Sequence, residues 1–309
     1  MIKTSWTFYV TLEILNYKQM KDQRHDKAQE RAQPERHRVQ DIPDEMRGHA
    51  PAYDNYSGNV STIYSKLAPV YDHIMKDVDY EDWTDYIDAV IRYHHPYGNR
   101  MLELACGTGT MALAMEERDD YEITATDASP EMIRIASEKG RRLKSGIRWL
   151  VQDMCRLDIG RRFDIIYMVF DSLNYLHRED EVLSLFESVA SHMDDDGIFV
   201  FDFTTPSFSP KIAPLLDGEQ RKLRNYRYRR NSRYDQEKGI HINHFFVEKR
   251  DPKTDLTIER FEEVHQQRIW TLTEIKSMVM RSKLRTLSAY EDFDFSEATD
   301  KSDRITLVL

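Results

Sequence analysis

Short apolar runs alternate with segments of helical periodicity over most of the chain. The runs have the length of single β-strands and span residues 100–105, 121–126, 147–152, 163–169 and 197–203. Strands that are apolar nearly throughout are typical of a parallel sheet covered on both faces. Together with the helical segments between them, they predict an α/β fold with a doubly wound, Rossmann-like sheet.

Helical segments surround these runs. Before the first run, five apolar residues recur at helical spacing, and Pro96 and Gly98 end that helix: Trp83, Tyr86, Ile87, Val90 and Ile91. A second apolar stripe predicts a helix over 179–193. Thr271 and Glu274 have the spacing of a capping box, which predicts the start of a helix over 272–282.

The pattern changes after residue 203. Segments 225–230, 240–249 and 256–270 alternate polar and apolar residues, and the turn-forming stretch 251–255 separates the last two. They predict antiparallel strands that form a lid over the parallel sheet. Two further strand-like segments, 284–293 and 303–309, end the chain.

The first part of the chain differs in composition. Residues 6–15 are apolar, but they contain Glu13, follow only one basic residue and lack a small-residue cleavage site, so neither a signal peptide nor a membrane span is expected. Residues 18–50 are almost entirely polar or charged. Such a segment buries too little apolar surface to fold on its own, so we expect a mobile N-terminal extension over 1–58 that carries no chemistry.

Composition narrows the function classes. The formal net charge of −10 argues against a protein whose main work is to bind a phosphate backbone, although a local basic face stays possible. Two cysteines provide no disulfide framework, which indicates a reducing, cytoplasmic location. No histidine, cysteine and carboxylate cluster has the spacing of a metal site, so no metal is expected.

Glu103 and the glycine loop that follows it suggest the ligand. Residues 107–112 match G-x-G-x-x-A, a dinucleotide fingerprint, but a carboxylate just before the loop would repel a pyrophosphate. A ligand with a cationic amine and no phosphate fits better, and the methionine part of S-adenosylmethionine has such an amine. Gly107 and Gly109 would then allow close backbone approach, since a Cβ at either position would displace the ligand.

Two more acids follow successive predicted strands. Asp127 lies 20 residues beyond Gly107, where a carboxylate can accept both hydroxyls of a ribose. Ser129 and Pro130 begin a helix and place Met132 where the face of an adenine could rest. Asp153 could accept the adenine amino group, with Met154 beside it. Each acid alone could be a solvated strand-end carboxylate, but three in register favour a ligand.

The segments "LELACGTGT", "ITATDASPEMI", "LVQDM" and "FDIIYMVFDSLNYL" resemble the successive motifs of class I S-adenosylmethionine-dependent methyltransferases. The resemblance covers residues 59–309 and implies a seven-stranded sheet whose last strand is antiparallel. It implies that Glu103, Ala105, Gly107 and Gly109 line the methionine end of the cofactor, Asp127 the ribose, and Asp153 and Met154 the adenine. Ala105 replaces the glycine that is commonest at its position in that family.

The flanking regions resemble a narrower group. Residues before the first strand are similar to the helical cap of bacterial small-molecule methyltransferases, which implies that Tyr71 closes over the cofactor and makes Tyr64 a candidate on the acceptor side. The strands of 204–270 resemble the lid of sugar-amine N-methyltransferases and related bacterial enzymes. The resemblance therefore divides the chain into a cofactor-binding domain, 59–203 with 271–309, and a lid insertion, 204–270.

Acceptor contacts are harder to predict, because methyl transfer has no universal catalytic residue. The segment after the fourth strand lacks the Asn/Asp-Pro-Pro-Tyr/Phe motif of enzymes that methylate base amines, so Asp171 and Asn174 are candidates for acceptor contacts or for structural roles. On a regular strand His265 and Arg268 face opposite sides. Resemblance puts both near the acceptor, with His265 as an acceptor contact or proton acceptor; alternatively, both hold the lid by hydrogen bonds.

The sequence is compatible with three functions. The expected one is S-adenosylmethionine-dependent methylation of a small molecule at nitrogen or oxygen, with no membrane partner and with the oligomeric state left open. Residues 221–234 interleave arginines with tyrosines, a composition suited to phosphate contact and base stacking, so RNA methylation is the alternative. A catalytically silent cofactor-binding module is the third.

Overall fold

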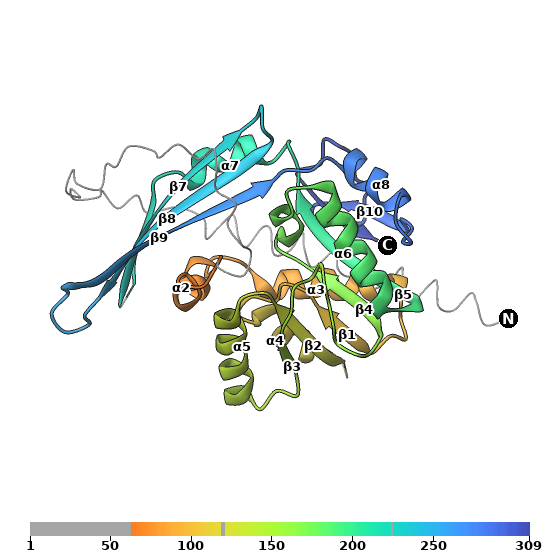
Figure 1. The fold of residues 1–309 in the computed structure, drawn as a ribbon, viewed down its shortest axis with the longest axis horizontal. Coiled ribbons are helices and arrows are strands. Elements are labelled where there is room, and N and C mark those ends of the chain that lie inside the picture. The colour runs from red at the N-terminus through yellow and green to blue at the C-terminus, as the bar shows by residue number, and fades with distance from the viewer. Residues whose placement is uncertain (1–62, 119–120, 224) are drawn as a thin grey trace, which may run out of the picture. The chain divides into compact units, whose positions relative to one another are not determined.

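A seven-stranded sheet forms the centre of the protein. The computed structural model describes residues 63–118, 121–223 and 225–309, so the expected N-terminal extension, 1–58, lies outside the described residues. The sheet order is β10-β11-β5-β4-β1-β2-β3, and every neighbouring pair is parallel except the two pairs that involve β11. The expected seven-stranded sheet with its last strand antiparallel is confirmed. Figure 1 labels strands β1 to β5 and β10 of this sheet.

The strands of this sheet lie where the apolar runs predict them. Their bounds are β1 Arg100–Glu103, β2 Glu122–Asp127, β3 Arg148–Val151, β4 Phe163–Met168, β5 Met193–Thr204, β10 Ser288–Glu291 and β11 Arg304–Val308. Strand β5 begins earlier than predicted, because the chain leaves the preceding helix directly into the strand.

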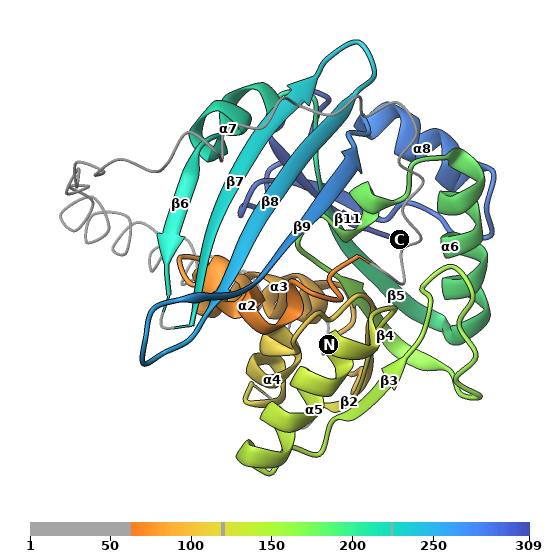
Figure 2. The same cartoon turned by 60° about the vertical axis from the view of Figure 1, so that its left-hand side comes forward.

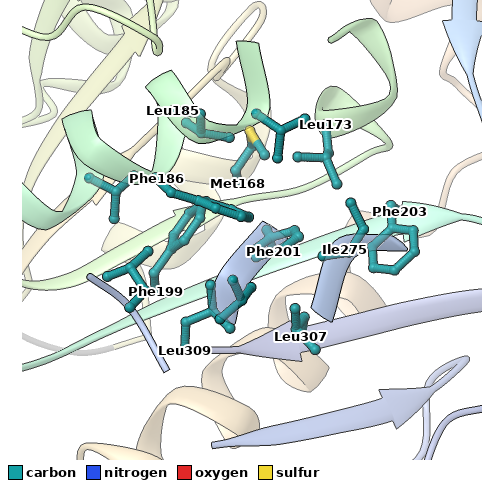
Figure 3. Packing of buried hydrophobic residues seen from close by; sticks show 14 of the residues in the cluster. Met168, Leu173, Leu185, Phe186, Phe199, Phe201, Phe203, Ile275, Leu307 and Leu309 are labelled. Carbon is teal, nitrogen blue, oxygen red and sulfur yellow. The ribbon is translucent and has the colours of Figure 1, made fainter. Parts of the chain in front are cut away.

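Helices cover both faces of the sheet. One face packs against α6, Glu179–His192, and α8, Leu272–Met280, and this packing is the main core (Figure 3). The remaining helices are α2 Ala68–Ile74, α3 Tyr80–His94, α4 Thr110–Glu116, α5 Pro130–Leu143 and α7 Ser209–Leu216, with a 3₁₀ turn, η3, at Ser172–Tyr175. The predicted capping box of α8 is confirmed: Glu274 N–H donates to Thr271 Oγ1 at 3.1 Å, and Thr271 N–H to Glu274 Oε2 at 2.8 Å.

A second sheet of four antiparallel strands comes from the segment between β5 and α8. Its strands are β6 Glu219–Lys222, β7 Tyr226–Asp235, β8 Ile240–Arg250 and β9 Thr257–Arg268. Strand β6 and helix α7 were not predicted, because their short polar or proline-containing sequences lack a clear period. Figure 2 shows α2 beside one end of this sheet. Leu67 and Val70 of the α2 region form a buried cluster with Phe245 and Val247 of β8.

Candidate functional site

Three carboxylates lie at the carboxyl ends of adjacent parallel strands. Glu103 is the last residue of β1, Asp127 is the last residue of β2, and Asp153 follows β3 by two residues. Because β1 pairs with β2 and β2 with β3, the predicted row of acids exists in the fold. Such a row at the carboxyl edge is where parallel α/β sheets bind ligands.

Glu103 is a buried acid, with 2% of its surface exposed. Its pKa is raised to about 8, mainly by burial and also by the negative charge of Asp127, while the nearby Tyr167 hydroxyl opposes the shift. Its Oε2 atom has no hydrogen-bond partner among the described residues. A buried acceptor without a donor is costly, and here it suits a ligand that brings a positively charged N–H group.

The two glycines of the loop, Gly107 and Gly109, are required for different physical reasons. Both are left-handed, with φ of 55° at Gly107 and 75° at Gly109. A Cβ on Gly107 would have only the Tyr71 ring nearby, at 3.6 Å, whereas a Cβ on Gly109 would come within 2.5 Å of the Trp149 ring. Gly109 is therefore required by packing against β3, a reason that differs from the ligand approach expected for it.

Ala105 also adopts a left-handed backbone, with φ of 52°. This conformation costs about 1–2 kcal/mol for a residue that carries a Cβ. The replacement of glycine by alanine at this position thus adds backbone strain as well as one methyl group.

Asp127 organises the loop from the neighbouring strand. Its Oδ2 accepts the Gly107 N–H at 2.9 Å and its Oδ1 accepts the Ser129 N–H at 2.8 Å. A carboxylate has about four acceptor positions, so both oxygens retain capacity for a further donor. Ser129 in turn accepts the Met132 N–H at 3.3 Å and begins α5, as predicted.

The predicted adenine residues have mixed environments. Asp153 accepts the Cys155 N–H at 2.9 Å, and its partly exposed side chain pairs with Arg156 at 3.2 Å. Met132 and Met154 are both buried. The assignment of these three residues to the adenine stays a prediction.

Two tyrosines of the cap meet at the loop. Tyr71, on α2, lies beside Gly107, and the rings of Tyr64 and Tyr71 pack edge to face with centroids 5.4 Å apart. Tyr64 has a φ of 66°, an uncommon backbone conformation for an aromatic residue. The cap therefore lies beside the glycine loop that follows β1. The closing of Tyr71 over the cofactor stays a prediction.

His265 lies at the junction of the lid and the cap. It is 2% exposed, its ring centroid is 4.4 Å from that of Tyr64, and its Nδ1 atom is 3.2 Å from the Tyr175 hydroxyl. Its Nε2 atom is 3.4 Å from Glu263 Oε2. Sequence reasoning did not assign roles to Tyr175 and Glu263, although Glu263 shares a strand face with His265 and Tyr175 follows the candidate Asn174.

Two other predicted acceptor residues are engaged within the protein. Asn174 is buried, donates to the Thr204 and Arg268 carbonyls, and accepts the Thr204 N–H. The Arg268 guanidinium donates to the Lys238 carbonyl at 2.6 Å. These contacts favour the structural alternative for Asn174 and Arg268.

Asp171 takes part in an ion-pair cluster that was not predicted. Its Oδ1 accepts from Arg304 at 2.5 Å, and the same guanidinium contacts the fully buried Asp202 and lies over the Trp83 ring. Burial raises the pKa of Asp202 to about 7, and Arg304 opposes this rise. A single arginine in the final strand shows no sequence pattern from which the cluster could have been found.

Four basic residues of the stretch 221–234 form ion pairs with acids. Arg221 pairs with Asp77 and Glu219, while Arg230 also pairs with Glu219. Lys222 and Arg227 pair with Asp255, and Tyr228 is buried. This arrangement favours the reading of the stretch as lid strands with paired charges.

The described residues show neither a metal site nor a membrane-spanning helix. Within residues 63–118, 121–223 and 225–309, no group of three or more His, Cys, Asp or Glu side chains is arranged to hold a metal ion. In the same ranges, no helix has the length and apolar character needed to cross a membrane.

Comparisons with known proteins agree with this geometry. Residues 101–197 match the family described as "Methyltransferase domain". The chain is 31% identical over 248 residues to YqeM of Bacillus subtilis, a protein assigned to the methyltransferases, with 79% of this chain and 95% of YqeM covered. It is 28% identical over 148 residues to a dTDP-3-amino-3,6-dideoxy-α-D-glucopyranose N,N-dimethyltransferase of Streptomyces fradiae, covering 48% of this chain and 54% of that enzyme.

A solved structure shows a similar fold over most of the chain. An S-adenosylmethionine-dependent methyltransferase from Clostridium acetobutylicum superposes with a TM-score of 0.66 at 26% identity, covering 79% of this chain and 97% of that protein.

Proposed function

Because this chain belongs to the family of S-adenosylmethionine-dependent methyltransferases, we propose that it methylates a nitrogen or oxygen atom of a small polar molecule. The enzyme class and the cofactor follow from family membership. The acceptor class and the roles of individual residues are the proposal.

The unpaired Oε2 atom of Glu103 is the main observation that supports a cofactor-binding role for individual residues. A cationic amine would supply the missing donor and stabilise the ionised carboxylate, whose pKa burial raises to about 8. Asp127 retains acceptor capacity for ribose hydroxyls, and Gly107 leaves room between the loop and Tyr71. These features fit S-adenosylmethionine better than a dinucleotide, whose pyrophosphate offers acceptor oxygens and no N–H donor for Glu103.

The bound cofactor supplies a methyl group on a sulfonium, which leaves as a neutral thioether. The protein's part is therefore to align the acceptor and to keep water away from the reacting atoms. Tyr64 and Tyr71 would cover the loop from the cap side. His265 would contact the acceptor or take its proton.

Two relatives support a small-molecule acceptor. The Streptomyces fradiae enzyme and a dTDP-3-amino-3,4,6-trideoxy-α-D-glucopyranose N,N-dimethyltransferase of Streptomyces venezuelae both carry amino-sugar names. Carboxylates pair with the basic residues of the lid that the RNA alternative would need, and no observation favours that alternative.

The test has a binding arm and an acceptor arm. We expect S-adenosylmethionine and S-adenosylhomocysteine to raise the melting temperature, and NAD to leave it unchanged. Asp127→Ala should weaken cofactor binding by about 1.5–3 kcal/mol, with the exposed Asp158→Ala as the matched control. A shift with NAD alone, or an unchanged dissociation constant for Asp127→Ala, would contradict the site.

The acceptor arm uses a labelled methyl donor. Amino-sugar nucleotides, beginning with dTDP-3-amino-3,6-dideoxy-α-D-glucopyranose, are compared with a metabolite extract and with bulk RNA. Label in a small molecule supports the proposal, and label in RNA alone would overturn it.

A further inference from the structure

Four side chains from three parts of the chain form one continuous chain of polar contacts beside the glycine loop. The Tyr64 and Tyr175 hydroxyls are 2.6 Å apart, and the Tyr175 hydroxyl is 3.2 Å from His265 Nδ1. His265 Nε2 faces Glu263 Oε2 at 3.4 Å. The cap supplies Tyr64, the turn after β4 supplies Tyr175, and lid strand β9 supplies the other two.

The partners of the imidazole define which nitrogen carries the proton. Nε2 has no hydrogen-bond partner among the described residues and faces Oε2 of Glu263 at 3.4 Å. Because that oxygen can only accept, the neutral ring is best satisfied with its proton on Nε2. Nδ1 is then an acceptor and receives the Tyr175 O–H. Tyr175 accepts from Tyr64, and the Tyr64 oxygen keeps a lone pair.

Glu263 is held in place independently of His265. Its Oε1 accepts the N–H groups of Lys66 and Leu67 at 2.8 and 2.9 Å, and its Oε2 accepts the Tyr64 N–H at 2.9 Å. The same carboxylate that faces the imidazole therefore also positions the backbone of Tyr64. The two ends of the chain of contacts are tied together by one residue.

We propose that Tyr64, Tyr175 and His265 form a proton relay from the methyl acceptor and that Glu263 is its positioning residue. This inference rests on the proposed function. As the acceptor lone pair forms its bond to the methyl carbon, the carbon–sulfur bond breaks and its electron pair stays on sulfur. The acceptor's proton passes to the Tyr64 oxygen, the Tyr64 proton to Tyr175, and the Tyr175 proton to His265 Nδ1.

The product of this transfer is an imidazolium beside a carboxylate. Glu263 stabilises that charge, as the carboxylate of a catalytic triad stabilises its histidine. Neither tyrosine needs to become a phenolate, because each gives up one proton as it takes another. Burial raises the pKa of the Tyr64 phenol well above its ordinary value, so a phenolate base at this position is disfavoured.

The first test needs no acceptor, so its failure can be told from a failure of the proposed acceptor class. Full-length protein with ¹⁵N-labelled histidine and saturating S-adenosylhomocysteine is studied at pH 9 by long-range ¹H–¹⁵N correlation, and the His265 signals are identified by their loss in His265→Gln. We expect the Nε2–H tautomer to predominate. Tyr175→Phe and Glu263→Gln should each raise the Nδ1–H fraction at least twofold.

Tyr93→Phe and Glu259→Gln are the matched controls and should leave the tautomer unchanged, because both side chains are exposed. A predominant Nδ1–H tautomer in the unmodified protein would overturn the relay, since Nδ1 could not then accept a proton. Fractions that neither Tyr175→Phe nor Glu263→Gln changes would overturn it as well.

The second test separates a relay from a purely structural cluster. With dTDP-3-amino-3,6-dideoxy-α-D-glucopyranose, or with the acceptor that the labelled screen identifies, Tyr175→Phe should lower kcat at least tenfold. KM and the cofactor dissociation constant should stay within about twofold of the values for the unmodified enzyme. The melting temperature should stay within about 2 °C. An unchanged kcat, or a loss explained by a lowered melting temperature, would assign the cluster to structure.

Discussion

At the scale of single residues, the protein keeps a carboxylic acid where a charged ligand group is expected. Glu103 is buried at the end of β1, and burial raises its pKa to about 8. The Glu103 carboxyl group therefore holds its proton more tightly in the folded protein than in the unfolded chain, where its pKa is near 4.5. The resulting stability is complete below about pH 4.5 and is lost as the pH rises through 8.

Glu103→Gln removes the loss of stability at high pH, because the amide stays uncharged. We expect the free energy of unfolding of the ligand-free variant to exceed that of the unmodified protein by about 1–3 kcal/mol at pH 8.5, with little difference at pH 5. Urea unfolding at the two pH values measures this difference. The exposed Glu187→Gln, whose partner Lys283 is also exposed, is the control and should change stability by less than about 0.5 kcal/mol.

The same variant should bind S-adenosylmethionine more weakly by about 1.5–3 kcal/mol, since a charge-assisted hydrogen bond is lost. Calorimetric titration measures this change. An unaltered dissociation constant would remove Glu103 from the cofactor site.

Ala105 provides a second residue-scale prediction. Ala105→Gly relieves a left-handed backbone that costs about 1–2 kcal/mol, while glycine adds about 0.4–1 kcal/mol of unfolded-chain entropy. We expect a net stabilisation of about 0.5–1 kcal/mol by urea unfolding. The neighbouring Ala112→Gly, inside α4, should instead destabilise by about 1 kcal/mol; equal destabilisation by both changes would show that Ala105 is unstrained.

At the scale of elements, strand β9 and helix α2 depend on each other through Glu263. The carboxylate accepts the N–H groups of Tyr64, Lys66 and Leu67, which directly precede α2. A lid strand thereby fixes the turn that leads into the cap helix.

Glu263→Ala should destabilise the protein by about 1–3 kcal/mol, because the partly buried N–H groups of Tyr64 and Leu67 lose their acceptor. Hydrogen exchange of the Tyr64, Lys66 and Leu67 amides should accelerate, while amides within β4 keep their protection. The control is Glu259→Ala, an exposed residue of the same strand. Unchanged exchange at those three amides would show that the bonds are not maintained in solution.

At the scale of the whole molecule, the last strand connects distant parts of the central sheet. Arg304 of β11 contacts Asp202 of β5 and Asp171 after β4, and its guanidinium lies over Trp83 of α3. Burial raises the pKa of Asp202 to about 7 even with this cation beside it. The C-terminal strand therefore supplies the charge that makes the buried acid tolerable.

Arg304→Met should destabilise the protein by about 3–5 kcal/mol, since it leaves a buried charge without its partner. Loss of the cation raises the pKa of Asp202 further. The free energy of unfolding of the variant therefore continues to fall as the pH rises above 7, whereas that of the unmodified protein levels off there. The destabilisation should thus be larger at pH 8.5 than at pH 5.5, as measured by urea unfolding. Arg281→Met, which breaks an exposed pair with Glu179, should cost less than about 1 kcal/mol at both values.

Local pattern was sufficient to predict the central sheet and the ends of its strands. The apolar runs predicted β1 to β5 and the final two strands, and the caps at Ser129 and Thr271 lie at the predicted helix starts. The acids Glu103 and Asp127 could be placed for the same reason: each ends a strand, and the ends of parallel strands meet at one edge. These features depend on residues a few positions apart, and a sequence records such spacing directly.

Tertiary structure alone decided which distant side chains meet. Glu263 and Leu67 are 196 positions apart, Tyr175 and His265 are 90 apart, and Arg304 reaches Asp171 across 133. Asn174 was a candidate acceptor contact by position, yet its amide is used by the Thr204 and Arg268 backbone. Strand order and the docking of the lid on the cap determine these contacts, and neither is encoded in the local period of apolar residues, because that period specifies an element's buried face but not its partner.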